Sequence, residues 1–244
     1  MSNKEIKIVR THDELYAKNV SKVPLKELFV EVASFIKNYK NNISRNISVA
    51  DIGCASGAFV NYLTSYFSQD KIVGYEYLDS LVKVGKKKFP NIEINQASVL
   101  DRGSIVESNF DVITFLGVLS LFDDIEPVVS NLVHWTKPGG KIFIHGLLNP
   151  DDVDVFIKYR TSENYGIPEH EAGWNIISQK TLAKIVTNNG GKNLQFHKFN
   201  LSIDLKKNFS DPLRGWTEKL ENNKKQVVNG LCINQPQFTL EFDI

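Results

Sequence analysis

The sequence predicts an α/β fold in which a mostly parallel sheet carries helices on both faces. Short apolar runs alternate with stretches of helical periodicity from residue 25 to residue 145, and this alternation is typical of parallel strands joined by crossover helices. A glycine turn follows the first apolar run. The length of 244 residues, with 42% apolar and 23% charged residues, fits one globular domain with modest insertions.

The first predicted element is a helix over residues 25–40, because apolar side chains recur there along one helical stripe. Short apolar runs then predict five buried strands, at residues 47–53, 71–76, 92–96, 110–115 and 141–145. Segments with helical spacing separate most of these strands, at about residues 59–67, 79–89 and 125–135. Pro138-Gly139-Gly140 is expected to form the turn before the fifth strand.

The pattern weakens after the fifth strand. Residues 149–175 mix acids, aromatic residues, glycine and proline, and we expect them to form an insertion over the carboxyl ends of the strands. Ser178 is expected to cap a last helix that ends at Asn189-Gly190-Gly191. Residues 193–205 and 236–243 are expected to form two closing strands.

Composition excludes several classes of partner. The 29 Lys and Arg residues nearly balance the 28 Asp and Glu residues, which gives a net charge of +1, so no global field favours nucleic acid. No stretch of 18 apolar residues predicts a membrane span, and the polar N-terminus does not resemble a secretory signal. Two distant cysteines, Cys54 and Cys232, suggest neither a disulfide framework nor a zinc cluster, so a reducing, cytoplasmic location is expected.

The most informative segment is the glycine turn Asp51-Ile52-Gly53-Cys54-Ala55-Ser56-Gly57. It follows the first strand, where open parallel sheets bind their ligands. The segment lacks the Gly-Lys-Ser/Thr of a Walker loop, and Ala55 and Ala58 stand where a dinucleotide-binding fingerprint would have glycines. A glycine turn without any ligand is the remaining alternative.

The spacing Asp-x-Gly-x-Ala-x-Gly, with an acid at the end of the second strand, resembles class I S-adenosylmethionine-dependent methyltransferases over residues 45–146. The resemblance implies a Rossmann-like, doubly wound, mostly parallel seven-stranded sheet with an antiparallel C-terminal strand. It also implies S-adenosylmethionine as the cofactor. The expected organisation is an N-terminal lid and helix over residues 1–44, and a methyltransferase domain over residues 45–244 with insertions at about 149–175 and 206–230.

The resemblance also implies roles for single residues. Gly53, Ala55 and Gly57 would form the cofactor loop, Asp51 would receive the amino group of the cofactor, and Glu76 would accept both ribose hydroxyls. A carboxylate has two acceptor oxygens, which suits a vicinal diol. Further cofactor contacts are expected from Cys54, Tyr77, Ser98, Val99, Phe115, Leu116 and, in an N-terminal lid at residues 12–22, Tyr16; Asp101 is an alternative to Ser98.

The turn after the fourth strand limits the classes of methyl acceptor that are expected. Phe115-Leu116-Gly117-Val118 lacks the Asn/Asp-Pro-Pro-Tyr/Phe motif that accompanies methylation of nucleobase amino groups. Asp123 and Asp124 follow it, but we expect them to cap the next helix rather than hold a metal ion. What remains is a small molecule or a sugar or glycan precursor. Three segments loosely resemble methyltransferases of bacterial surface-polysaccharide synthesis: residues 173–178, 211–217 and 229–231.

Three functions stay open at this point. The first is O-methylation of such an acceptor by a monomer or homodimer. The second is a non-catalytic protein that binds S-adenosylmethionine and regulates or scaffolds a partner. The third is an oxidoreductase, which the spacing from Gly53 to Gly57 opposes.

A hydroxyl acceptor has to lose a proton, and histidine is the usual general base. Of five histidines, His170 is the first candidate, because it lies in the insertion between Glu169 and Glu171 and a neighbouring carboxylate would raise its basicity. His145, at the end of the fifth strand, is the second candidate.

Overall fold

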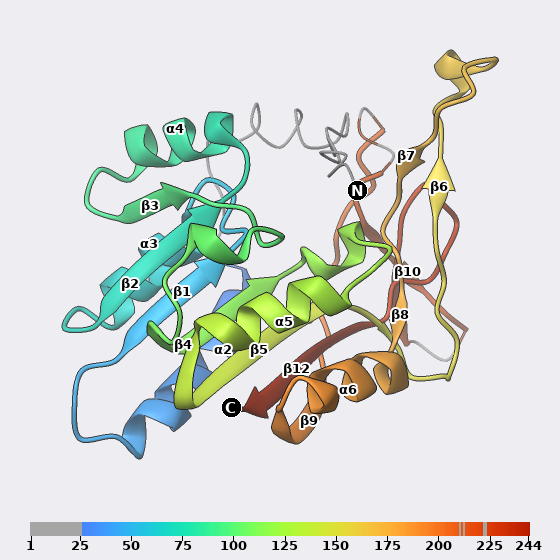
Figure 1. Ribbon diagram of the computed structural model, residues 1–244. Coiled ribbons are helices and arrows are strands. Elements are labelled where there is room, and N and C mark those ends of the chain that lie inside the picture. The colour runs from blue at the N-terminus through green and yellow to red at the C-terminus, as the bar shows by residue number, and fades with distance from the viewer. Residues whose placement is uncertain (1–25, 210, 212, 222–223) are drawn as a thin grey trace, which may run out of the picture.

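The computed structural model describes residues 26–209, 211, 213–221 and 224–244. Its central sheet has the strand order β3-β2-β1-β4-β5-β12-β9 (Figure 1). The strands span Ser48–Ile52 (β1), Lys71–Glu76 (β2), Glu93–Gln96 (β3), Phe110–Leu116 (β4), Thr136–Asn149 (β5), Lys192–Lys198 (β9) and Gln237–Asp243 (β12). Strands β1 to β5 pair in parallel, and β12 runs antiparallel to both β5 and β9. The predicted mostly parallel, seven-stranded Rossmann-like sheet with an antiparallel C-terminal strand is confirmed.

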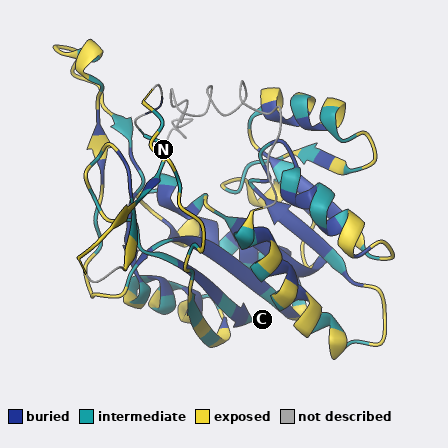
Figure 2. Ribbon diagram, turned by 180° about the vertical axis from the view of Figure 1, so that it is seen from behind, coloured by how far each residue is buried: buried dark blue, intermediate teal, exposed yellow. Residues whose placement is uncertain are grey.

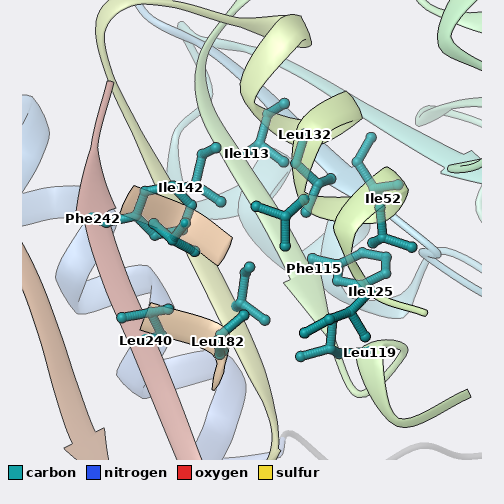
Figure 3. Packing of buried hydrophobic residues seen from close by; sticks show 14 of the residues in the cluster. Ile52, Ile113, Phe115, Leu119, Ile125, Leu132, Ile142, Leu182, Leu240 and Phe242 are labelled. Carbon is teal, nitrogen blue, oxygen red and sulfur yellow. The ribbon is translucent and has the colours of Figure 1, made fainter. Parts of the chain in front are cut away.

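Helices cover both faces of this sheet. They span Glu27–Asn41 (α2), Ala58–Tyr66 (α3), Asp79–Lys88 (α4), Glu126–Trp135 (α5) and Gln179–Asn188 (α6). Residues of α5 and α6 pack with one apolar cluster, which includes Leu132, Leu182 and Phe115 (Figure 3). Residues of α2, α3 and α4 pack with a second cluster on the other face. Between them, β1, β2 and β4 are almost entirely buried (Figure 2), which explains why they read as continuous apolar runs. The edge strands β3 and β9 are mostly exposed or half-buried.

The fifth strand is longer than predicted. Pro138-Gly139-Gly140 lies inside β5, which begins at Thr136. The φ angle of Gly139 is +77°, and the pairing of β4 with β5 shifts register between Phe110 and Val112. The expected turn is therefore an irregularity within one strand, at a residue that needs the left-handed conformation open to glycine.

The 149–175 insertion contains a hairpin of β6 (Lys158–Tyr159) and β7 (Glu171–Ala172), which projects from the sheet (Figure 1). Asn175, fully buried, fixes its base: Nδ2 donates to the Phe122 carbonyl and to Asp123 Oδ1, and Oδ1 accepts from Ile157 N–H. The expectation that Asp123 caps α5 is therefore wrong, since its carboxylate binds Asn175 and Lys158.

Asp124 does accept a hydrogen bond from Glu126 N–H at 3.1 Å, at the start of α5. Ser178 caps α6 as predicted, since its hydroxyl accepts from Thr181 N–H at 3.1 Å.

The segment at 206–230 contains a second hairpin, of β10 (Trp216–Lys219) and β11 (Lys225–Val228). Strand β8 (Ile177–Ser178) pairs with the end of β5, and three short 3₁₀ helices complete the described part: η1 (Arg102–Ser104), η2 (Leu119–Leu121) and η3 (Ser162–Asn164). None of the helices described is long and apolar enough to cross a membrane.

Candidate active site

The glycine loop joins β1 to α3 and is fastened to the end of β2. Gly53 N–H and Cys54 N–H both donate to the Tyr75 carbonyl, at 2.7 and 3.0 Å. Gly53, Ala55 and Gly57 have φ angles of +73°, +49° and +76°. The chain therefore turns through three left-handed residues at alternate positions, and glycine is the residue that adopts this conformation without strain.

Close packing also requires two of these glycines. A Cβ at Gly57 would lie 2.4 Å from Ile94 Cδ1 and 2.7 Å from Ile92 Cδ1. A Cβ at Gly53 would lie 2.6 Å from a methyl group of Val118, in the turn after β4. The loop thus packs closely against β3 and against the turn after β4, which leaves no room for a side chain at Gly53 or Gly57.

Asp51 lies beneath this loop, in register with Thr114 on β4. Only 3% of Asp51 is exposed, and the Thr114 hydroxyl donates to its Oδ1 at 2.7 Å. Burial raises the pKa of Asp51 to about 7; the Thr114 hydrogen bond opposes this rise, and the nearby Glu76 carboxylate adds to it. A cation at this position would restore the charged form of Asp51.

Glu76 ends β2 beside the loop. Its Oε2 accepts from Ala55 N–H and its Oε1 accepts from Leu78 N–H, both at 2.9 Å. The carboxylate therefore has a fixed orientation between two strand ends. Because each carboxylate oxygen can accept two hydrogen bonds, these backbone contacts are compatible with two ribose hydroxyls.

The structure brings only some of the other predicted residues to the same edge with their side chains exposed. Tyr77 is 47% exposed next to Glu76. The Ser98 hydroxyl accepts from Leu100 N–H at 3.2 Å, Val99 is partly buried, and Asp101 caps the short helix η1. Phe115 and Cys54 have buried side chains that belong to the two core clusters, whereas Leu116 is half-buried. Contacts of Phe115 or Cys54 with a cofactor would therefore come from the backbone.

The two candidate bases lie in different settings. His145 is 5% exposed and sits at the ligand side of β5, where its carbonyl accepts from Gly117 N–H at 2.8 Å. Burial lowers the pKa of His145 to about 4, and the Gln237 side chain opposes this. His170 is exposed on the projecting hairpin. The Glu171 carboxylate beside it accepts from the Tyr159 hydroxyl at 2.7 Å.

Tyr16 and the expected lid at residues 12–22 lie outside the described residues. Thr114, whose hydroxyl fixes Asp51, was not predicted from the sequence. A polar residue within the apolar run 110–116 was the available signal. Thr239, which contacts both His145 and Glu31, was also not predicted. Thr239 is likewise a polar residue in an apolar strand, and Glu31 interrupts the apolar face of its helix.

Comparisons with known proteins agree with this geometry. Residues 50–142 match the family model described as a methyltransferase domain. Protein 235L of Invertebrate iridescent virus 6, named as a methyltransferase, is 22% identical over 182 residues, which cover 66% of this chain and 67% of that protein. The sterol 4-C-methyltransferase strm-1 of Caenorhabditis elegans is 25% identical over 135 residues. The match covers 53% of this chain and only 38% of that enzyme.

The fold has close counterparts among solved structures. A crystal structure of a S-adenosylmethionine-dependent methyltransferase from Methanosarcina mazei superposes with a TM-score of 0.59 at 13% identity, covering 91% of this chain and 99% of that chain. The residues at the carboxyl ends of the strands fit this cofactor, because two carboxylates flank the glycine loop, one suited to an ammonium group and one to a diol. Over residues 50–142 the chain is therefore similar to the methyltransferase-domain family, and its fold is that of the solved S-adenosylmethionine-dependent methyltransferase from Methanosarcina mazei.

Proposed function

We propose that the protein transfers a methyl group to a hydroxyl oxygen of a small molecule or of a sugar or glycan precursor. The observation that carries this proposal is a neutral, buried imidazole, His145, which lies within β5 next to the turn that follows β4. A neutral histidine can receive the proton that a hydroxyl acceptor loses. The sugar or glycan class is supported only by the loose resemblance of residues 173–178, 211–217 and 229–231.

When bound, S-adenosylmethionine supplies a methyl group on a sulfonium, which is a good methyl donor because its sulfur leaves as a neutral thioether. The chain then has three tasks. The loop at Gly53–Gly57, with Asp51 and Glu76, holds the cofactor at the ends of β1 and β2. The turn at Gly117 and the adjoining part of β5 around His145 place the acceptor oxygen, since alignment supplies much of the rate of such a displacement. A histidine receives the hydroxyl proton.

The position of the two histidines reverses the order expected from sequence. His145 is joined through its backbone to the turn after β4, at the edge that carries the cofactor loop. His170 lies on the hairpin that projects from the sheet (Figure 1), and its neighbour Glu171 is engaged by Tyr159. We therefore place His145 first, as the residue that accepts the proton. His170 remains the alternative base, for a closed state of the hairpin.

The test is methyl transfer from labelled S-adenosylmethionine to small molecules extracted from cells, with the product identified by mass spectrometry. We expect an O-methylated product, and His145→Ala should lower kcat by about 10²–10⁴-fold with cofactor affinity nearly unchanged. His170→Ala serves as the matched control and should retain turnover. Methylation at carbon would contradict the O-methyl proposal. Cofactor binding without turnover on any extract would favour the non-catalytic alternative.

A further inference from the structure

Three polar side chains from three different elements form a chain of hydrogen bonds that ends at His145. Thr239 of β12 is the register partner of His145 on β5. Its Oγ1 lies 3.0 Å from His145 Nδ1 and 3.4 Å from Glu31 Oε2 on α2. The chain therefore connects the ligand side of the sheet with the helix that covers it.

This chain lies in the interior of the protein. Thr239 is fully buried, His145 is 5% exposed, and Glu31 is partly buried. Burial raises the pKa of Glu31, while Thr239 and the nearby His197 oppose the rise. His197 itself lies 3.2 Å from Glu241 Oε2 through its Nε2. With the pKa of His145 lowered by burial, its ring is neutral at pH 7 and carries one N–H and one lone pair; besides Thr239, the Gln237 side chain is a hydrogen-bond partner of the ring.

The single hydroxyl hydrogen of Thr239 decides which nitrogen carries that N–H. The hydroxyl donates to the Glu31 carboxylate, and a carboxylate is the stronger acceptor of the two neighbours. The Thr239 oxygen is then left as an acceptor toward His145, so Nδ1 must be the protonated nitrogen. The lone pair lies on Nε2, on the opposite side of the ring.

We propose that Glu31 and Thr239 are positioning residues that fix the Nδ1–H tautomer of His145 and present its Nε2 as the proton acceptor. This inference rests on the proposed function, in which His145 receives the proton of the acceptor hydroxyl.

Neighbouring contacts hold the parts of the chain in place. The Phe199 ring packs edge-on against the His145 ring, with centroids 5.3 Å apart and planes at 88°, and this restricts rotation of the imidazole. One turn before Glu31 on α2, the Glu27 carboxylate accepts from Ser202 N–H at 2.8 Å, which fastens the start of the helix beside β9. The orientation of the His145 ring therefore depends on the position of α2 against the sheet.

The first experiment measures the imidazole ¹⁵N shifts of His145 by NMR in the wild-type protein, Thr239→Val and Thr239→Ser. Valine has nearly the shape of threonine but no hydroxyl, whereas serine keeps the hydroxyl. We expect the Nδ1–H tautomer in the wild-type and Thr239→Ser proteins, and loss of that preference in Thr239→Val. A wild-type Nε2–H tautomer, or an unchanged preference in Thr239→Val, would overturn the inference. Thermal melts verify that both variants are folded.

The second experiment distinguishes this inference from the proposed function. In the labelled-cofactor assay, Thr239→Val should lower kcat by about 10–100-fold, Thr239→Ser should restore it, and calorimetry should show an unchanged affinity for S-adenosylhomocysteine. If the tautomer responds to Thr239→Val while His145→Ala retains full turnover, the hydrogen-bonded chain stands and His145 is not the base. If His145→Ala is inactive while Thr239→Val retains full kcat, the base role stands and the positioning role fails.

Discussion

Asp51 and Thr114 face each other across β1 and β4, and the Thr114 hydroxyl donates to the Asp51 carboxylate at 2.7 Å. This hydrogen bond fixes the carboxylate beneath the glycine loop, but it does not fully offset the cost of burying a charge. Asp51 therefore titrates near pH 7 in the protein without cofactor, rather than near its ordinary value of about 4. The binding of a cationic amino group and the ionisation of Asp51 should be coupled.

That coupling predicts a pH dependence of cofactor affinity. Below pH 7, the protonated Asp51 must lose its proton before it can bind an ammonium group, so the Kd for S-adenosylhomocysteine should rise by about tenfold per pH unit. Above pH 7 the Kd should level off. Calorimetry from pH 5.5 to pH 8.5 measures this dependence, and Asp51→Asn should bind weakly with a nearly flat profile. A flat wild-type profile would contradict the coupling.

The same substitution has the opposite effect on the stability of the protein without cofactor. Because the folded-state pKa of Asp51 lies above the unfolded value, the folded protein binds a proton between about pH 4 and pH 7 that the unfolded chain has lost. The Asp51 contribution to the free energy of unfolding therefore falls as the pH rises through this window. An asparagine side chain does not ionise, so Asp51→Asn should melt at a higher temperature than the wild-type protein at pH 8.

The proposed contact between the Glu76 carboxylate and the ribose hydroxyls of the cofactor can be tested by substitution. Loss of a charge-assisted hydrogen bond removes about 1.5–3 kcal/mol, so Glu76→Ala should weaken S-adenosylhomocysteine binding by about 10–150-fold. The substitution also removes the acceptor of Ala55 N–H and Leu78 N–H, which loosens the loop. A 2′-deoxy analogue of the ligand separates the two effects. The wild-type protein should prefer the ribose form and Glu76→Ala should not; equal discrimination by both proteins would exclude the ribose contact.

The sequence predicts the features that depend on local pattern. The alternation of strands and helices, the Ser178 cap and the glycine turn each involve residues within a few positions of one another, so periodicity and turn chemistry suffice. The hairpins β6–β7 and β10–β11 are not predicted, since their strands of two and four residues are too short and polar to show a period. The pairing of His145 with Thr239 spans 94 positions and arises only when β12 inserts beside β5.

The close packing of the cofactor loop predicts different costs for two alanine substitutions. Gly57 and Gly139 have φ angles of +76° and +77°. An alanine in this left-handed conformation costs about 1–2 kcal/mol, and this cost applies equally to both substitutions. A Cβ at Gly57 would meet Ile94 at 2.4 Å, whereas a Cβ at Gly139 has no atom within 4 Å. Gly57→Ala should therefore reduce the free energy of unfolding by about 1–3 kcal/mol more than Gly139→Ala. Denaturant unfolding of both variants measures the difference. Equal losses in the free energy of unfolding would show that the Ile94 side chain can move away from an added Cβ at little cost.

The buried carboxylate of Asp111 lies at the amino end of β4, at the opposite end of the strands from the glycine loop. We expect it to make the stability of the protein sensitive to acid, independently of the cofactor. Asp111 is 2% exposed, accepts from Ser48 N–H at 2.8 Å, and forms ion pairs with Arg45 and Lys137. Burial alone would raise the pKa of Asp111, but these partners outweigh it and hold the pKa well below its usual range. The folded-state pKa is depressed, so the stabilisation is complete above about pH 4 and is lost as the pH falls toward the folded-state value.

Asp111→Asn removes the charge from this buried cluster and leaves Arg45 and Lys137 without their partner. We expect a loss of roughly 1–3 kcal/mol in the free energy of unfolding at pH 7, because the charge-assisted hydrogen bonds to Asp111 are weakened while the partly exposed Arg45 and Lys137 stay solvated. The difference between the wild-type and variant proteins should shrink as the pH falls from 4 to 2, since Asp111 of the unfolded wild-type chain then takes up a proton that the folded protein does not bind. Because Asp111 lies at the amino end of β4, away from the loop after β1, folded Asp111→Asn should bind S-adenosylhomocysteine as tightly as the wild-type protein. A stability difference that stays constant down to pH 2 would show that Asp111 does not ionise as the buried ion pairs require.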